Sequence, residues 1–385
     1  MPEPQPCPQA DQRLLVARND LTRSRWVGDP DAPAARALAE GEARLRIQQF
    51  ALTANNITYA VFGETMKYWQ FFPADDAEWG CIPVWGFAEV TGSRAPALAV
   101  GDRVYGFLPM GSYLVVQAEA ASADSLVDTR AHRRELPAVY NRLQRVRAAA
   151  GQQPQREALR ALLQPLFTTS FLIDDFMAGH GFFGASQIVL SSASSKTAWG
   201  TAFCLAQRRG QPGVPRVIGL TSAPHRDFVA GLGCFDEVLG YDALDTPGTL
   251  DAAAATVYID FAGSAALRQH VHEHFGSRLA YSCSVGGAHW QALGGSRGLP
   301  GPRPVLFFAP AQWAGRSAPP PEGWGSEELQ RRMGTAWQAF QAAVDAPGGA
   351  WLQVEHGQGP EALLAALTAQ LQGRVAPRIG QMLAL

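Results

Sequence analysis

The segment at 191–197, SSASSKT, combines four serine hydroxyls, a threonine hydroxyl and one ammonium. It follows an apolar stretch and begins a helical pattern. The start of a helix favours negative charge through its free N–H groups and its dipole, so this segment suits a phosphate. Serines also cap helices without binding any ligand, and capping is the competing interpretation. The candidate ligand residues here are Ser192, Ser194, Ser195, Lys196 and Thr197.

Lysine is rare in this chain, because only Lys67 and Lys196 occur among 32 basic residues. An ammonium is a compact point charge and a guanidinium is a planar fork, so the two are not interchangeable at a tight site. Chance explains the retention of two lysines equally well. Both nevertheless lie in segments that are selected on other grounds, and we expect Lys196 to strengthen phosphate binding at the serine-rich turn.

The next apolar segment, 216–221, ends in Thr221-Ser222, and Arg226 follows within about a turn. Dinucleotide sites that select NAD usually place an acidic residue at this point to hold the ribose hydroxyls, whereas an arginine accommodates a 2′-phosphate. The pattern therefore predicts NADP(H) as the cofactor, if a dinucleotide binds. An ordinary polar loop explains the same three residues without a ligand.

A second group of candidate residues lies in the N-terminal third. A polar turn at 55–56 precedes Tyr59, and Lys67 and Tyr68 stand just before the aromatic run at 69–72. Tyrosine and lysine can donate a hydrogen bond to an oxyanion and deliver a proton. Tyr59 is the first candidate for this role, followed by Lys67 and Tyr68. The aromatic run is alternatively a hydrophobic wall with no chemical role.

Alternating strand and helix patterns surround the serine-rich turn from about residue 165 onward. Apolar strands separated by helices indicate a parallel sheet covered on both faces, which is the doubly wound type of nucleotide-binding domain. The strand candidates are 187–192, 216–221, 237–241, 256–262, 278–285 and 304–310, and the helix candidates are 196–209, 224–232, 264–275 and 327–343. In such a sheet the first strand-to-helix turn faces the ligand, which places 191–197 at the expected site.

The rest of the chain is expected to form a second, β-rich domain. It comprises 13–165, rejoined by 345–385, and carries an Arg-rich helical insertion at 129–163. The doubly wound domain takes 166–344, and the Pro- and Gln-rich residues 1–12 form a disordered tail. The predicted fold class is thus α/β with two domains.

Composition narrows the function classes. The 385 residues are 47% hydrophobic and 17% charged with a net charge of −2, which argues against a protein that coats nucleic acid or a membrane. No apolar run reaches the length of a membrane span, and the N-terminus lacks the pattern of a signal peptide. Five scattered cysteines make neither a disulfide framework nor a CxxC motif. A cytoplasmic protein that acts on a small molecule is expected.

The order of the two domains and several motifs resemble the medium-chain dehydrogenase/reductase superfamily. VGDRVYGF at 100–107 is similar to its VGDRV element, the residues 217–241 to its second strand, helix and third strand, and DFAG at 260–263 to the turn after its fourth strand. The similarity spans roughly 44–385 apart from the insertion. The segments SSASSKTAWGTAF, PLFTTSFLIDDF and AVYNR are more closely similar to an uncharacterised bacterial family filed as a domain of unknown function, which implies no activity.

The resemblance implies a GroES-like β-rich domain, a Rossmann-type domain and a zinc-free NADPH-dependent reductase of an activated carbon–carbon double bond or a quinone. The Cys–His–Cys ligands of zinc-dependent members are missing, so neither catalytic nor structural zinc is expected. Zinc-free members carry an asparagine in the turn that Asn55 matches. The glycines of the phosphate turn are replaced, which keeps two alternatives open: a lyase or hydratase that binds a phosphorylated or coenzyme A-type ligand, and a non-catalytic binding protein.

A homodimer is expected from the apolar segment at 305–308. As the last strand of the sheet it would leave an open edge, and pairing with a second copy covers that edge.

Overall fold

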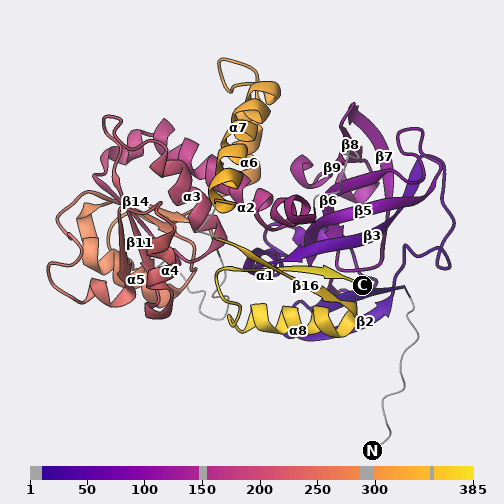
Figure 1. The fold of residues 1–385 in the computed structure, drawn as a ribbon, viewed down its shortest axis with the longest axis horizontal. Helices are drawn as coiled ribbons and strands as arrows, with labels where there is room; N and C mark the ends of the chain where they lie inside the picture. The colour runs from indigo at the N-terminus through magenta and orange to yellow at the C-terminus, as the bar shows by residue number, and fades with distance from the viewer. Residues whose placement is uncertain (1–10, 147–153, 287–297, 347–350) are drawn as a thin grey trace, which may run out of the picture. The chain divides into compact units, whose positions relative to one another are not determined.

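The computed structural model describes residues 11–146, 154–286, 298–346 and 351–385. The chain divides into two compact units, whose elements are labelled in Figure 1. The first unit contains Met1–Leu162, Val354–Val375 and Gly380–Leu385, and the second contains Leu163–Gln353 and Ala376–Ile379. Most of the tail expected at 1–12 lies outside the described residues, and the first strand, β1 (Gln12–Ala17), begins at its end.

The first unit is built on a closed barrel. Its strands are β3 (Glu42–Leu52), β5 (Pro83–Ser93), β6 (Arg103–Pro109), β7 (Tyr113–Ser122), β8 (Ser125–Asp128), β9 (Arg142–Arg145), β16 (Gln353–Gln358) and β17 (Ile379–Ala384). The order is β16-β17-β3-β5-β6-β9-β8-β7, and a further pairing of β3 with β7 closes the last six strands on themselves. Phe50, Phe87 and Phe107 are fully buried on these strands.

A small sheet and two helices complete this unit. The sheet has the order β2-β1-β4, with β2 at Asp20–Gly28 and β4 at Trp79–Gly80. Helix α1 (Ala54–Val61) follows β3 directly, and the Thr53 backbone N–H donates to the side chain of Asn56 at 2.7 Å in a capping box. Helix α8 (Gly359–Leu371) packs against α1. The start of α1 is thereby fixed, which positions Tyr59 within it.

The Arg-rich stretch at 129–163, which we expected to be helical, is α-helical only in its last part among the residues that the structure describes. It forms two 3-10 turns and then strand β9, and helix α2 (Pro154–Gly179) begins only at its end. The buried carboxylate of Asp128 pairs with Arg133 at 2.7 Å and with Arg130 at 3.2 Å, so these arginines neutralise a buried charge. Pairing of β9 with β6 and β8 overrides the local helical pattern. The two turns are Ala131–Arg133 and Ala138–Tyr140.

The second unit confirms the predicted parallel sheet. Its strands are β10 (Gln187–Leu190), β11 (Arg216–Thr221), β12 (Glu237–Gly240), β13 (Thr256–Asp260), β14 (Leu279–Ser284) and β15 (Val305–Leu306). The order is β12-β11-β10-β13-β14-β15, and every neighbouring pair is parallel. The helices are α3 (Lys196–Ala206), α4 (Arg226–Gly231), α5 (Ala265–Phe275), α6 (Ala309–Ser317) and α7 (Ser326–Val344).

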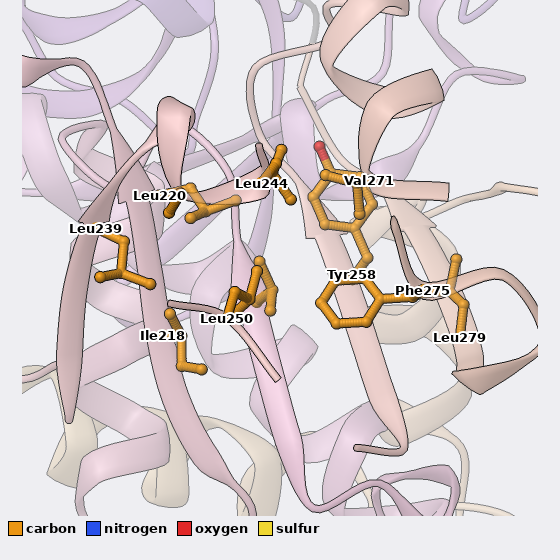
Figure 2. Close-up of a cluster of buried hydrophobic side chains, with 11 residues drawn as sticks. Ile218, Leu220, Leu239, Leu244, Leu250, Tyr258, Val271, Phe275 and Leu279 are labelled. Carbon is orange, nitrogen blue, oxygen red and sulfur yellow. The ribbon is translucent and has the colours of Figure 1, made fainter. Parts of the chain in front are cut away.

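A cluster of apolar side chains joins α5 to one face of this sheet (Figure 2). Val271 and Phe275 of α5 pack with Tyr258 of β13 and with Ile218 and Leu220 of β11. All of these side chains are buried. Because helices cover the strands of such a sheet, most strand side chains are buried, and each strand is a short run of apolar residues in the sequence.

The last strand differs in length from the prediction at 304–310. Val305 and Leu306 pair with β14, and the N–H of Phe307 donates to the carbonyl oxygen of Ser284 at 2.8 Å. Helix α6 then begins at Ala309 with a proline in its first turn. Val305 and Leu306 are 47% and 45% exposed, which makes β15 an apolar open edge. None of the described helices is long and apolar enough to cross a membrane.

Candidate active site

The strand order of the second unit reverses between β10 and β13. At this point the crevice beyond the carboxyl ends of the strands is the usual ligand position. Ser191, directly after β10, donates to Asp260 Oδ1 at 2.8 Å, and its Oγ accepts from the N–H groups of Phe261 and Ala262 at 3.0 and 3.1 Å. These bonds tie the ends of the two strands together, so the first strand-to-helix turn starts from a rigid base.

The serine-rich turn reaches the helix without a glycine. Ser192 has a φ of 46°, in the left-handed region where glycine is usual, and its N–H donates to the hydroxyl of Tyr241 at 3.2 Å. Ser195 is the N-cap of α3, with its Oγ 3.4 Å from the N–H of Ala198. For Ser195 the capping interpretation therefore holds in this structure. Ser194 is half-buried beside it.

The first N–H groups of α3 belong to Lys196 and Thr197, and groups at these positions have no acceptor within their own helix. Together with the helix dipole they favour an anion at the turn. The Lys196 ammonium, however, is directed elsewhere. Its Nζ donates to the carbonyl oxygens of Pro377 at 2.9 Å and Ile379 at 2.7 Å, and burial lowers the pKa of Lys196 to about 7.

Two polar groups lie at and just after the end of the neighbouring strand β11: a buried hydroxyl without a hydrogen-bond partner among the described residues, and an exposed guanidinium. The Thr221 hydroxyl is buried and has no hydrogen-bond partner in the part of the chain that the structure describes. The Ser222 hydroxyl lies 3.1 Å from Nδ1 of His225, and Arg226 is exposed at the first residue of α4. An unpaired buried hydroxyl and a solvated cation beside a helix N-terminus fit a phosphorylated ribose.

The tyrosines of the first unit form one aromatic cluster. The ring centroids of Tyr59 and Tyr68 are 4.7 Å apart, and Tyr140 lies 5.6 Å from Tyr68. The Tyr59 hydroxyl accepts from Nε1 of Trp85 at 3.1 Å and also bonds to the side chain of Asn55. The hydroxyls of Tyr68 and Tyr140 are 3.0 Å apart.

Hydrogen-bond counting separates Tyr59 from the other two tyrosines. The Tyr59 hydroxyl already has two protein partners, whereas Tyr68 and Tyr140 share one bond that uses only one of their two protons. If Tyr140 donates, the proton of Tyr68 is left for another acceptor. Burial raises the pKa of Tyr59 to about 12 and raises those of Tyr68 and Tyr140 above the ordinary value, so all three stay protonated donors at neutral pH.

Lys67 precedes Tyr68 in a left-handed conformation, with a φ of 61°, and is exposed. The aromatic run after Tyr68 behaves as a hydrophobic wall, since Phe71 and Phe72 are buried and the guanidinium of Arg133 lies over both rings at 5.3 and 5.0 Å. Asn56, next to Asn55, is buried and donates to the carbonyl oxygen of Pro83 at 2.8 Å, so it has a structural role.

The family description "Protein of unknown function (DUF2855)" comes from a model that matches residues 50–376. The chain belongs to this family. No curated protein matches this DUF2855 member in sequence. The match agrees with the resemblance expected from the sequence, and the family description assigns no activity.

Solved structures share the fold of this DUF2855 protein over nearly its full length. CurA from Vibrio vulnificus, crystallised with NADPH, is 15% identical, with a TM-score of 0.60 over 97% of this chain and 98% of that one. CurK enoyl reductase is 13% identical with a TM-score of 0.54 over 98% and 99%. Mycobacterial Rv1454c, complexed with NADPH, is 15% identical with a TM-score of 0.53 over 98% and 100%. At these identities the likeness shows a shared fold, which confirms the predicted β-rich and Rossmann-type class.

Sequence reasoning did not select Ser191, Asp260 or Tyr241 as individual candidates, although they lie in segments that it singled out. Each lies at the carboxyl end of one of three strands in the same sheet, and the carboxyl ends of parallel strands meet at one edge. That placement is the signal that could have identified them. Within the described residues, no group of three or more His, Cys, Asp or Glu side chains could hold a metal ion.

Proposed function

We propose that this DUF2855 protein is a zinc-free, NADP(H)-dependent reductase of an activated carbon–carbon double bond or a quinone. One observation carries the proposal: the N-terminus of α3 stands at the switch point of a parallel sheet, with Thr221 at the end of the adjacent strand and Arg226 at the start of the helix that follows it. Structures of the same fold that bind NADPH support it. Arg226 would pair with the 2′-phosphate, and Lys196 and Thr197 would donate backbone N–H groups to the pyrophosphate.

The tyrosine cluster would supply the proton of such a reduction. NADPH, if held by the residues named above, would be the source of the hydride that such a reduction needs. Tyr68 donates its free O–H to the substrate oxygen, where negative charge develops, and can deliver the proton. Tyr140 keeps that proton on Tyr68 available by donating its own to the Tyr68 oxygen. Tyr59, Asn55 and Lys67 remain candidates that position the substrate.

A non-redox enzyme or binding protein for a phosphorylated or coenzyme A-type ligand is the second candidate. The glycine-free turn favours it, because the Ser192 and Ser195 side chains occupy space that glycine leaves open to a dinucleotide. Titration of the purified protein with NADPH, NADH and coenzyme A, followed by tryptophan fluorescence, separates the two. Tightest binding to NADPH supports the reductase, and binding to coenzyme A alone contradicts it.

Arg226→Gln should reduce NADPH affinity by about 10- to 100-fold and leave NADH affinity almost unchanged. The reason is that a charge-assisted hydrogen bond contributes roughly 1.5–3 kcal/mol, and only NADPH carries the 2′-phosphate. Arg216→Gln is the matched control, because Arg216 is an exposed arginine at the opposite end of β11, paired with Glu237 at 3.0 Å. Equal losses for both coenzymes would remove Arg226 from the 2′-phosphate site.

We further propose a homodimer in which two β15 edges pair. The exposed Val305 and Leu306 would leave water, and the open edge of the sheet would disappear. Light scattering should report a dimer at micromolar concentration, and Leu306→Lys should shift it to a monomer because the charge cannot be buried at the paired edge. Val100→Lys is the matched control, since Val100 is 66% exposed outside the sheet edge. A monomeric parent protein contradicts the proposal.

A further inference from the structure

The side chain of Lys196 is held by backbone carbonyl groups and not by a counter-ion. Nζ lies 2.9 Å from the carbonyl oxygen of Pro377, 2.7 Å from that of Ile379 and 5.3 Å from the ring centroid of Trp199. All of these residues belong to the second unit. A guanidinium would bring five N–H donors to two acceptors, which gives a physical reason for a lysine in an arginine-rich chain.

The acceptors around Nζ match the donors of a neutral amine. A neutral amine has two N–H groups, which the two carbonyl oxygens satisfy, while an ammonium has a third. Among the described residues, these two carbonyl groups are the hydrogen-bond acceptors of Nζ. Neither carries a full negative charge, and burial accordingly lowers the pKa of Lys196 to about 7. Nζ can therefore be protonated or deprotonated while both hydrogen bonds to the carbonyl oxygens stay in place.

The charged groups on the surrounding elements supply no counter-ion to Lys196. Arg378 lies between the two carbonyl residues, with its guanidinium 5.5 Å from the ring of Phe228, and Arg226 and Asp227 are exposed at the start of α4. The pKa shift of Lys196 has burial as its cause and no contribution from these groups. On α2 and α7, Asp174 is paired with Arg208, and Glu328 with Arg331 and Arg332.

We propose that Lys196 takes up a proton when an anion fills the turn at Ser192–Thr197. The free N–H groups at the start of α3 belong to Lys196 itself and to Thr197, so an anion bound there lies against the backbone of the residue that carries the ammonium. The negative charge of a phosphate at that position favours the protonated form of the nearby amine through space, and solvent supplies the proton. The inference rests on the proposed function in so far as that function places a phosphate at the turn. Its consequence is an anion affinity that falls as the pH rises above neutrality.

Calorimetry of NADPH binding at about pH 8, in two buffers of different ionisation enthalpy, measures the proton directly. At roughly one pH unit above the pKa of the free protein, the parent should take up roughly half a proton or more per ligand. Lys196→Met and Lys196→Arg should take up none at this residue, because methionine does not titrate and arginine stays charged. Arg216→Gln, which removes an exposed cation at the opposite end of β11, should keep the uptake of the parent.

The outcomes separate this inference from the proposed function. Equal proton uptake by the parent and Lys196→Met overturns the inference, and NADPH binding would still stand. If the parent does not bind NADPH, the same titration is made with inorganic pyrophosphate. Uptake that depends on Lys196 then supports the proton-coupled anion site while the reductase proposal fails, and pyrophosphate binding without uptake overturns the inference.

Discussion

Tyr68→Phe is expected to lower kcat for NADPH-dependent reduction of an enone or quinone by about 10²- to 10⁴-fold, the usual contribution of a positioned proton donor. Of the two hydroxyl groups in the Tyr68–Tyr140 pair, the substitution removes the one whose proton is free when Tyr140 donates to it at 3.0 Å. NADPH affinity should change little, because Tyr68 is not among the groups proposed to hold the pyrophosphate and the 2′-phosphate. Steady-state kinetics and fluorescence titration of the same variant check both statements.

Tyr59→Phe is the matched control for this prediction. It removes the same hydroxyl from the ring 4.7 Å away, but that hydroxyl is engaged by Trp85 and Asn55. We expect a smaller loss in kcat, of about tenfold or less, from the disturbed packing and the unpaired Trp85 N–H. If Tyr59→Phe is the more damaging variant, the proton donor is Tyr59 and the tyrosine pair has only a structural role.

Lys196→Met should change the pH dependence of stability in a direction that the pKa determines. The pKa of Lys196 is about 7 in the folded protein, against 10.5 for an ordinary lysine. Between these pH values the unfolded chain binds more protons than the folded one. The contribution of Lys196 to the free energy of unfolding therefore rises with pH. The difference between the parent and Lys196→Met should therefore rise by up to about 1.4 kcal/mol per pH unit across this window and be flat below about pH 7.

Urea unfolding of both proteins at several pH values without ligand measures this difference. Lys67→Met provides the reference, because Lys67 is exposed and its removal should leave the pH profile parallel to that of the parent. Parallel profiles for Lys196→Met and the parent would mean that the lysine stays charged in the folded protein. In that case the two carbonyl groups alone stabilise the ammonium.

The sheet of the second unit could be predicted from the sequence because its signals are local. The middle of a segment such as 216–221 is a run of apolar residues, since a parallel strand is covered on both faces, and polar residues bound this run. The position of the serine-rich turn at the carboxyl edge followed from strand order alone. The helical pattern at 129–163 was wrong for residues 142–145, because their backbone pairs with β6 and β8, and those strands come from earlier parts of the chain.

By itself the sequence determined the fold class, the strand-to-helix turn and the residue types available at each site. Only the tertiary structure decided what those side chains contact. The partners of Lys196 stand 181 and 183 residues further along the chain, and the partner of Tyr68 stands 72 residues away. A local pattern reports which face of an element is buried, but a hydrogen bond depends on which distant backbone or side chain packs there. The two carbonyl oxygens that accept from Lys196 and the Tyr140 hydroxyl that bonds to Tyr68 are therefore contacts that a local pattern cannot predict.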